Sequence, residues 1–256
     1  MIIVNADDCG ISKHVNEEIR SCIEEGIITS TTIMANMEAF DGALALYDDY
    51  HDYVSFGIHV NLTEGVPLLN SQLLLDRGFY KENKGKIHLN GKAYMLKKID
   101  KAMRGEIYKE VSAQVEKLLD NGVSLSHIDS HHHIHTRPYI LPVICKVAKK
   151  YGITKMRRDL NVTEFISYKN NLWQWGWKYY MKLLNYHLRC VDKASSATNF
   201  YRLILNRGLY SDKIDYELMC HPGNPGEGFQ KEMFMMKENP LGKGDFSLYM
   251  SNYYLF

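Results

Sequence analysis

The sequence predicts an α/β fold with a mostly parallel sheet, and it favours a barrel or a distorted relative of one over a doubly wound open sheet. Short apolar segments alternate with segments of helical period along the 256-residue chain, which is typical of parallel strands joined by helices. Reactive side chains follow the ends of separate predicted strands, and barrel active sites gather at those ends. The length fits one domain over residues 1–256, and no repeat or low-complexity linker divides it.

The first quarter of the chain carries three predicted strands and two predicted helices. The strands are short apolar or β-branched runs over residues 2–6, 29–35 and 54–62. The first helix begins after Ser12, a good N-cap, and ends at Gly26. The second helix is expected over residues 39–50. Strand and helix therefore alternate from the start.

The middle of the chain is less regular. Residues 70–104 lack a clear period and predict an inserted excursion over one face of the fold. The apolar period then predicts a helix over residues 106–121. Thr136 is expected to cap a helix with Pro138 near its first turn and Tyr151 at its end. The other predicted elements are strands over 124–129, 153–157 and 216–220, a helix over 172–190, and a last strand in the tail from Phe246.

Composition and charge narrow the classes of function. The net charge of +1 gives no support for binding to nucleic acid or to an anionic membrane. Five cysteines without a CxxC pair predict reduced thiols in a reducing compartment. The N-terminus resembles a strand more than a signal peptide, and no apolar run reaches the length of a membrane span. We therefore expect a cytoplasmic protein, and a homodimer stays open.

The most informative segment is His127–His135, which holds five of the eleven histidines and one aspartate. Imidazole and carboxylate are the ligands that a borderline divalent metal prefers. On an extended chain Asp129, His131, His133 and His135 would share one face, and on a helix His131 and His135 would. The alternative is a polar surface loop with no role for its histidines.

Asp8, His59 and His131 together form a two-histidine, one-carboxylate set that leaves room for water and substrate, which is typical of a catalytic metal site. Asp129 is a candidate to orient one imidazole. Asp7 precedes Asp8, and at an irregular strand end one of the two can bind metal while the other handles a proton. The alternatives are a hydrogen-bonded core histidine at 59 and an acid pair that favours a helix N-terminus.

Two further residues are candidates for catalysis. His221 precedes Pro-Gly, which places its imidazole at a loop mouth as a candidate general acid, although a solvated turn histidine would fit the same sequence. Arg157 ends a predicted strand on its inward face and is a candidate to pair with an active-site carboxylate. Surface charge is the alternative for this arginine.

These residues resemble the YdjC-like carbohydrate deacetylase family, which includes chitooligosaccharide deacetylases, over nearly the whole chain. The resemblance is carried by several motifs in order, which are Asn5–Gly10, Gly26–Asn36, Gly57–Leu68, His127–His135 and His221–Gly223. It implies a distorted, incomplete (β/α) barrel that hydrolyses acetyl groups of acetamido sugars. It also implies that Asp7 is the base, that Asp8, His59 and His131 hold the metal, and that His221 is the acid.

The chain departs from the family at two places, and the metal stays open. Cys9 stands where the family usually has an aromatic residue, and Gln230–Met233 stands where the family has an Arg-Glu segment, which leaves any arginine role there in doubt. The resemblance implies Mg²⁺, whereas two imidazoles suit Zn²⁺ or another first-row metal better. We expect a short acetylated sugar as substrate. A metal phosphoesterase and a non-catalytic metal- or sugar-binding protein are the competing functions.

Overall fold

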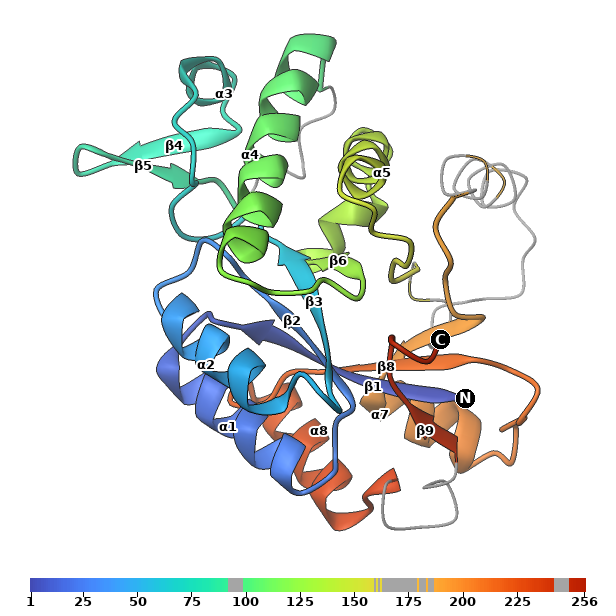
Figure 1. Cartoon of the computed structure of the whole chain (residues 1–256). Coiled ribbons are helices and arrows are strands. Elements are labelled where there is room, and N and C mark those ends of the chain that lie inside the picture. The colour runs from blue at the N-terminus through green and yellow to red at the C-terminus, as the bar shows by residue number, and fades with distance from the viewer. Residues whose placement is uncertain are drawn as a thin grey trace.

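The computed structural model describes residues 1–91, 99–158, 160, 162, 179, 183, 187–241 and 249–256. Its centre is a curled parallel sheet with the strand order β6-β3-β2-β1-β8-β7, and β9 also pairs with β1 (Figure 1). The strands of this sheet are β1 (Ile2–Cys9), β2 (Ser30–Ile33), β3 (Ser55–Val60), β6 (Ile128–Ser130), β7 (Lys193–Ser196), β8 (Tyr216–Cys220) and β9 (Met250–Ser251).

Two isolated bridges extend the curl beyond β6. Ile128 pairs with Met156, and Lys155 pairs with Arg189, both in parallel. Arg189 lies four residues before β7, so the chain passes from the β6 side of the sheet to the β7 side within a short distance. The result is the predicted distorted, incomplete barrel of mostly parallel strands. The strand expected over residues 153–157 is reduced to these bridges.

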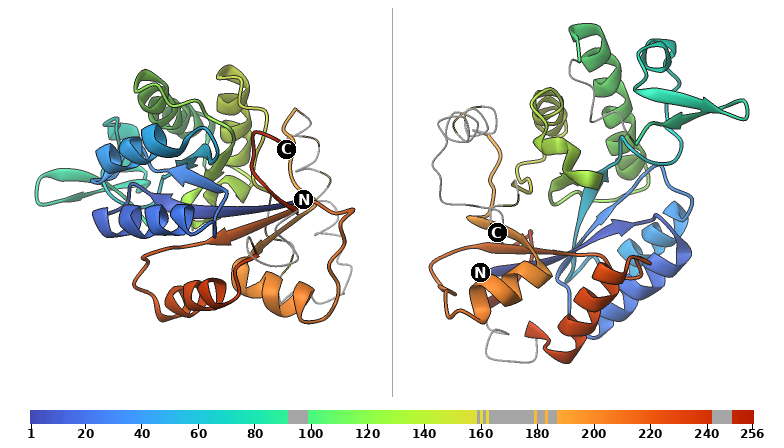
Figure 2. Two further views of the ribbon diagram at one scale, coloured as in Figure 1. Left: turned by 60° about the horizontal axis from the view of Figure 1, so that its bottom comes forward. Right: turned by 180° about the vertical axis from the view of Figure 1, so that it is seen from behind.

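Helices cover the outer face of the curled sheet, as Figures 1 and 2 show from three directions. α1 contacts β1, α4 contacts β3, and both α7 and α8 contact β8. The helices are α1 (Lys13–Glu24), α2 (Phe40–Tyr50), α3 (Gln72–Asp76), α4 (Lys101–Asp120), α5 (Leu141–Lys150), α7 (Ala197–Phe200) and α8 (Glu227–Glu238), with a 3-10 segment η2 (His131–Thr136) and a π-helical turn η3 (Tyr201–Leu205).

Alternation along the strands separates an apolar outer layer from a polar interior. On β1, Ile2, Val4 and Ala6 join the large core beneath the helices. Ile3 points to the other side, where it meets a smaller apolar cluster that includes Tyr253 of the C-terminal segment. Further along the strand, the interior positions become Asn5 and Asp7, both buried. Near its carboxyl end, β1 therefore carries polar side chains on its inward face.

The C-terminal segment fills the barrel interior beneath these polar residues. Tyr253 is fully buried, donates its backbone N–H to Ser55 Oγ at 3.1 Å and stacks on the His127 ring with 3.6 Å between centroids. A Cβ atom at position 57 would lie 2.6 Å from the His127 imidazole, so only glycine leaves room for that ring. Gly57 is thus required by packing inside the barrel.

Several predicted elements agree with the structure, and the expected helix cap at Thr136 is wrong. Ser12 Oγ accepts from Val15 N at 3.2 Å and begins α1 as expected. Thr136 instead ends the 3-10 segment, and the next helix begins at Leu141. The 70–104 excursion contains α3 and an antiparallel hairpin of β4 (Tyr80–Asn83) and β5 (Lys86–Leu89). Most of the helix expected over 172–190 lies outside the described residues.

None of the described helices has the length and apolar character required to cross a membrane.

Candidate functional site

The site begins with an irregularity at the end of β1. Between the pairs Ala6–Thr31 and Cys9–Ile33, β1 contains one more residue than β2, which is a β-bulge. Within it Asp8 has a φ of 67°, a left-handed conformation that costs a non-glycine residue about 1–3 kcal/mol. The bulge breaks the alternation of side chains. Asp7 and Asp8, which would face opposite sides of a regular strand, therefore both reach the end of the barrel.

Asp8 from β1, His59 from β3 and His131, which directly follows β6, converge at this end. Asp8 Oδ1 lies 2.7 Å from His131 Nδ1 and 3.2 Å from His59 Nε2. The ligand atoms of the three side chains all lie within 4.8 Å of one another, and all three residues are buried. A carboxylate oxygen and two imidazole nitrogens focused on one point form a donor set that fits a divalent cation. The structure thus brings together the three ligands expected from the sequence.

Each of the two imidazoles also contacts a second carboxylate. Asp129 Oδ1 lies 2.6 Å from His59 Nδ1, and Glu64 Oε2 lies 3.0 Å from His131 Nε2. Carboxylates in this position fix the ring orientation and the tautomer of a metal-binding histidine. Asp129 is fully buried and also accepts from Thr32 Oγ1 at 3.1 Å, whereas the Glu64 side chain is half exposed. Asp129 thus lies against an imidazole, as expected, and the structure adds Glu64 as a second carboxylate in such a position.

The charges of this cluster compensate one another. Burial opposes the charged form of Asp8, but hydrogen bonds and attraction from His131 and His59 hold the pKa of this carboxyl well below its ordinary value. Burial also opposes the imidazolium of His59, but Asp129 and Asp8 raise its pKa to about 10. The pKa of His131 is raised for the same reason by Asp8 and Glu64, against its burial. A divalent cation placed among these groups would displace the two protons.

Asp7 lies beside this cluster in a salt bridge with Arg157. The guanidinium donates from Nη1 to Asp7 Oδ2 at 2.7 Å and from Nη2 to Oδ1 at 2.6 Å, and Asn5 Nδ2 donates to Oδ1 at 2.9 Å. Burial raises the pKa of Asp7, but the charge and hydrogen bonds of Arg157 outweigh it, so the pKa lies below its ordinary value. Asp7 is therefore held as a carboxylate in a fixed orientation.

Arg157 is itself completely buried, and it has two further acidic partners. Its Nη2 lies 2.9 Å from Asp129 Oδ2, and its Nε donates to Glu217 Oε1 at 2.6 Å. Tyr253 Oη donates to the other oxygen of Glu217 at 2.6 Å. Arg157 thus pairs with Asp7, one of the candidate catalytic carboxylates. Because its side chain is enclosed by protein, Arg157 positions Asp7 and does not face the space where a ligand would enter.

His221 lies beside Asp7 and directly follows β8. Its Nε2 lies 4.0 Å from Asp7 Oδ2, and its Nδ1 lies 4.0 Å from Glu232 Oε2 on α8. Burial lowers the pKa of His221, but the negative charges of Glu232 and Asp7 outweigh it and raise the pKa. Glu232 is anchored by the backbone N–H and hydroxyl of Thr198, at 3.0 and 3.1 Å. Both ring nitrogens of His221 thus lie near a carboxylate, which favours the imidazolium form.

The remaining histidines of the 127–135 segment follow neither of the two expected geometries. β6 ends at Ser130, and the chain turns into the 3-10 segment with positive φ at His132 (54°) and His133 (51°). His131 alone reaches Asp8, while His132 Nδ1 contacts Thr63 Oγ1 and His135 Nδ1 contacts Ser130 Oγ. Burial lowers the pKa of His135 to about 3, so that ring is neutral. The histidines are divided between the candidate metal centre and the loop that supports it.

Sequence reasoning did not single out Glu64, Glu217, Glu232 or Tyr253. Glu64 lies inside Gly57–Leu68, one of the motifs that carry the family resemblance, and this position could have marked it as a candidate site residue. Glu217 occupies an inward position on a strand otherwise formed by apolar residues, and a lone acid in such a run indicates a buried partner. Glu232 lies in Gln230–Met233, the segment that stands where the family has an Arg-Glu segment, so it had a motif signal too. Tyr253 carries no comparable signal, because its partners are distant in the chain.

Comparisons with known proteins concern the family and the fold of the chain. The profile of a family described as YdjC-like protein matches residues 1–245. A solved structure from Enterococcus faecalis V583, provisionally named as a cellobiose-phosphate cleavage protein, superposes with a TM-score of 0.70. The superposition covers 99% of this chain and 97% of that one at 22% sequence identity, so the likeness concerns the fold.

Three relatives that bear the name carbohydrate deacetylase match a shorter part of the chain. The protein from Brevibacillus brevis is 40% identical over 152 residues, and that from Geobacillus stearothermophilus is 41% identical over 151 residues. Each alignment covers 59% of this chain and 57% of the relative. A Listeria monocytogenes protein is 38% identical over 166 residues, which are 64% of this chain and 63% of the relative. The matched part thus spans somewhat more than half of each relative.

Proposed function

The chain belongs to the YdjC-like protein family, and from this premise we propose that it is a metal-dependent hydrolase that removes acetyl groups from N-acetylated sugars. The observation that carries the proposal is the buried convergence of Asp8, His59 and His131 beside the Arg157-bound Asp7 and His221. The name that the relatives bear, carbohydrate deacetylase, supports it. The finer proposal is a short N-acetylglucosamine oligosaccharide as substrate, with Mg²⁺, Zn²⁺ or another first-row metal.

In this proposal Asp8, His59 and His131 hold the cation. The donor set fits it, since both imidazoles are oriented by carboxylates and the ligand atoms share one focus. A divalent cation there supplies Lewis acidity, which polarises the acetyl carbonyl and lowers the pKa of water. The strained φ of Asp8 is consistent with a residue held in place for a ligand, because such strain persists where the surrounding structure enforces it.

Asp7 is the proposed general base. Arg157 keeps it deprotonated, and because Oδ1 accepts from both Arg157 and Asn5, a lone pair of Oδ2 is left for a proton of the attacking water. The water oxygen then forms a bond to the acetyl carbon while Asp7 takes the proton. The low pKa makes Asp7 a weak base, so it can deprotonate only water whose own pKa the bound cation would have lowered. Asn5 and Arg157 fix its orientation and so reduce the entropy cost of this step.

His221 is the proposed general acid. As the bond between the acetyl carbon and the amide nitrogen breaks, the nitrogen needs a proton, and the raised pKa of His221 favours the imidazolium that provides it. A carboxylate oxygen of Asp7 lies 4.0 Å from Nε2 and one of Glu232 lies 4.0 Å from Nδ1, and both stabilise that charge. The products are acetate and the free amine of the sugar. Transfer of the proton from Asp7 to solvent or to His221 returns the site to its initial state.

Acetate release is the assay that tests this function. The purified protein, loaded in turn with Mg²⁺ and Zn²⁺, is incubated with N-acetylglucosamine, its β-linked oligomers, acetyl-lysine and an acetylated peptide. We expect a higher kcat/KM for the sugars than for the acetylated amines without a ring, and loss of all acetate release with chelator. A better kcat/KM for acetyl-lysine would contradict the carbohydrate part of the proposal, and full activity after chelation would contradict the metal part.

Glu64 gives a test of the candidate metal centre that does not depend on the substrate. We expect Glu64→Ala to weaken metal binding about ten- to a hundredfold, since loss of a carboxylate behind a metal-binding imidazole has effects of this size. Glu64→Gln keeps an acceptor for His131 and should lose less. Titration of the metal-free protein with Zn²⁺ measures both affinities. Glu82→Ala, an exposed carboxylate change on β4, is the matched control. Equal affinities in all four proteins would remove Glu64 from this role.

A further inference from the structure

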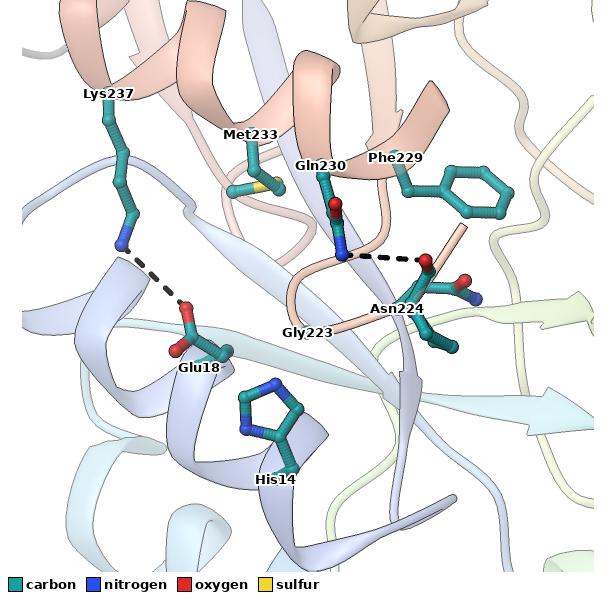
Figure 3. Close-up of a pocket in the computed structure, with 9 residues that line it drawn as sticks. His14, Glu18, Gly223, Asn224, Phe229, Gln230, Met233 and Lys237 are labelled. Atoms are coloured by element: carbon teal, nitrogen blue, oxygen red, sulfur yellow. Dashed lines mark hydrogen bonds and ion pairs between the residues drawn. The ribbon is translucent and has the colours of Figure 1, made fainter. Parts of the chain in front are cut away.

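The two neighbours of Asp7, His221 and Arg157, have different surroundings. The His221 ring packs against the Phe229 ring with 4.3 Å between centroids, and Phe229 stands between it and a pocket of about 320 Å³ that α1, α8 and the loop before α8 enclose (Figure 3). Arg157 is completely buried, and so are the groups that hold it. Because Arg157 is the bidentate partner of Asp7, the orientation of Asp7 depends on what fixes this guanidinium.

Glu217 fixes the guanidinium of Arg157 at its Nε. The two terminal nitrogens donate to Asp7 at 2.7 and 2.6 Å, and Nε donates to Glu217 Oε1 at 2.6 Å. A guanidinium is planar and rigid, so contacts at Nε and at both terminal nitrogens determine its direction. Without the contact at Nε the group could pivot, and its two hydrogen bonds to Asp7 would turn with it. Glu217 thus sets the plane in which Asp7 is held.

Tyr253 in turn holds Glu217. Oε1 of Glu217 accepts from Arg157, and Oε2 accepts from Tyr253 Oη at 2.6 Å. Burial raises the pKa of Glu217, whereas the charge of Arg157 and the hydrogen bond from Tyr253 act in the opposite direction. The hydroxyl therefore favours the charged form of Glu217, which is the form that compensates the guanidinium.

Tyr253 is placed by contacts outside the candidate metal centre. Its backbone N–H donates to Ser55 Oγ at 3.1 Å, and its ring stacks on His127 with 3.6 Å between centroids. Just before it, β9 pairs in parallel with the first residues of β1, the strand that carries Asp7. The C-terminal segment is therefore in register with the strand of the proposed base.

Stability alone does not account for these buried charges. Among the described residues, the carboxylates of Asp7, Asp129 and Glu217 contact the one guanidinium of Arg157, and all four residues are buried. Removing charges from water costs several kcal/mol for each ion, and apolar residues of similar volume often give equal or greater stability. The direction that this arrangement gives to Asp7 explains it better than a gain in stability.

We infer that Glu217 and Tyr253 are positioning residues for the proposed base, so that the C-terminal segment is part of the candidate active site. The inference rests on the proposed function and deepens it. Both side chains are enclosed by protein and take no part in proton transfer. They fix the guanidinium that fixes Asp7, and the alignment of a base with the attacking water contributes to kcat.

Tyr253→Phe tests the inference by removing one oxygen atom. The stacking and backbone contacts of the residue stay, and only Glu217 loses a partner. We expect kcat for acetate release from N-acetylglucosamine oligomers to fall about tenfold or more, with KM and metal content unchanged, since misalignment acts on the reaction step. Tyr201→Phe is the matched control, because it removes a hydroxyl that donates to Asn239 O at 2.6 Å. It should lose thermal stability but no kcat.

Two further comparisons separate positioning from a general loss of structure. Glu217→Gln keeps an acceptor for Arg157 Nε and should retain more kcat than Glu217→Ala. In the Asp7→Asn background Tyr253→Phe should lower kcat no further, since no base remains to be aligned. Wild-type kcat in Tyr253→Phe, an equal loss in Tyr201→Phe, or a full additional loss in the Asp7→Asn background would overturn the inference.

A spectroscopic measurement makes the test independent of turnover. Nitrogen NMR of protein with labelled arginine reports the Nε–H group of Arg157, which is identified by its loss in Arg157→Lys. In Tyr253→Phe this resonance should shift and its proton should exchange faster with water, whereas Tyr201→Phe should leave both unchanged. An unchanged resonance in Tyr253→Phe would overturn the inference. A resonance that responds as expected, in a wild type that releases acetate from no sugar, would contradict the proposed function alone.

Discussion

Replacing either His59 or His131 by alanine is expected to remove most of the bound divalent metal and the acetate release together. Each change deletes one of three donors that share a single focus, and the remaining two cannot hold a divalent cation as tightly. His59→Ala also leaves the buried Asp129 without its 2.6 Å partner, so a loss of stability accompanies the loss of metal. Metal content per chain, measured on the purified variants, and acetate release report the two effects separately.

A control is needed because imidazole loss alone can alter folding. His51→Ala changes an exposed histidine at the end of α2 whose contacts are with Tyr47 and Asp52, not with the candidate metal ligands, and it should keep both metal and activity. Thermal unfolding of every variant, with and without added Zn²⁺, distinguishes metal loss from misfolding, since a bound ion stabilises only the protein that holds it. One metal ion per chain in both His59→Ala and His131→Ala would show that the cation binds elsewhere.

Asp7→Asn and His221→Ala are expected to behave in the opposite way, with the metal kept and turnover lost. A general base and a general acid act in the transition state, so their removal lowers kcat and leaves KM and metal affinity nearly unchanged. Each change should lower kcat about a hundredfold or more. Asp7→Asn also preserves the shape that fills the space beside Arg157, whose remaining partners Asp129 and Glu217 keep its charge compensated.

Steady-state kinetics and metal content on the same preparations decide this assignment. The double variant adds a further check, because groups that act together in one reaction have non-additive effects. Asp7→Asn, His221→Ala together should therefore lose less than the product of the two single losses. Near wild-type kcat in either single variant would eliminate that residue from the mechanism, and loss of metal in Asp7→Asn would assign it to the cation instead.

The sequence alone determined the parts that depend on local order along the chain. Strand–helix alternation predicted the parallel sheet, Ser12 marked the start of α1, and β8 coincides with the predicted run Tyr216–Cys220. The position of Asp8, His59 and His131 after separate strands predicted that they would converge, because parallel strands bring their carboxyl ends to one edge. These inferences hold because strand period and capping involve residues only a few positions apart.

Only the tertiary structure decided how the side chains of the site are aimed and supported. The bulge that turns Asp8 towards the histidines and the left-handed φ of His132 are imposed by packing, against local preference, so no period in the sequence reveals them. The support of Asp7 by Arg157 joins residues 150 positions apart, and Tyr253 is 36 positions from Glu217. Such contacts form because burial forces charged and polar groups to find partners anywhere in the folded chain, whatever their separation in the sequence.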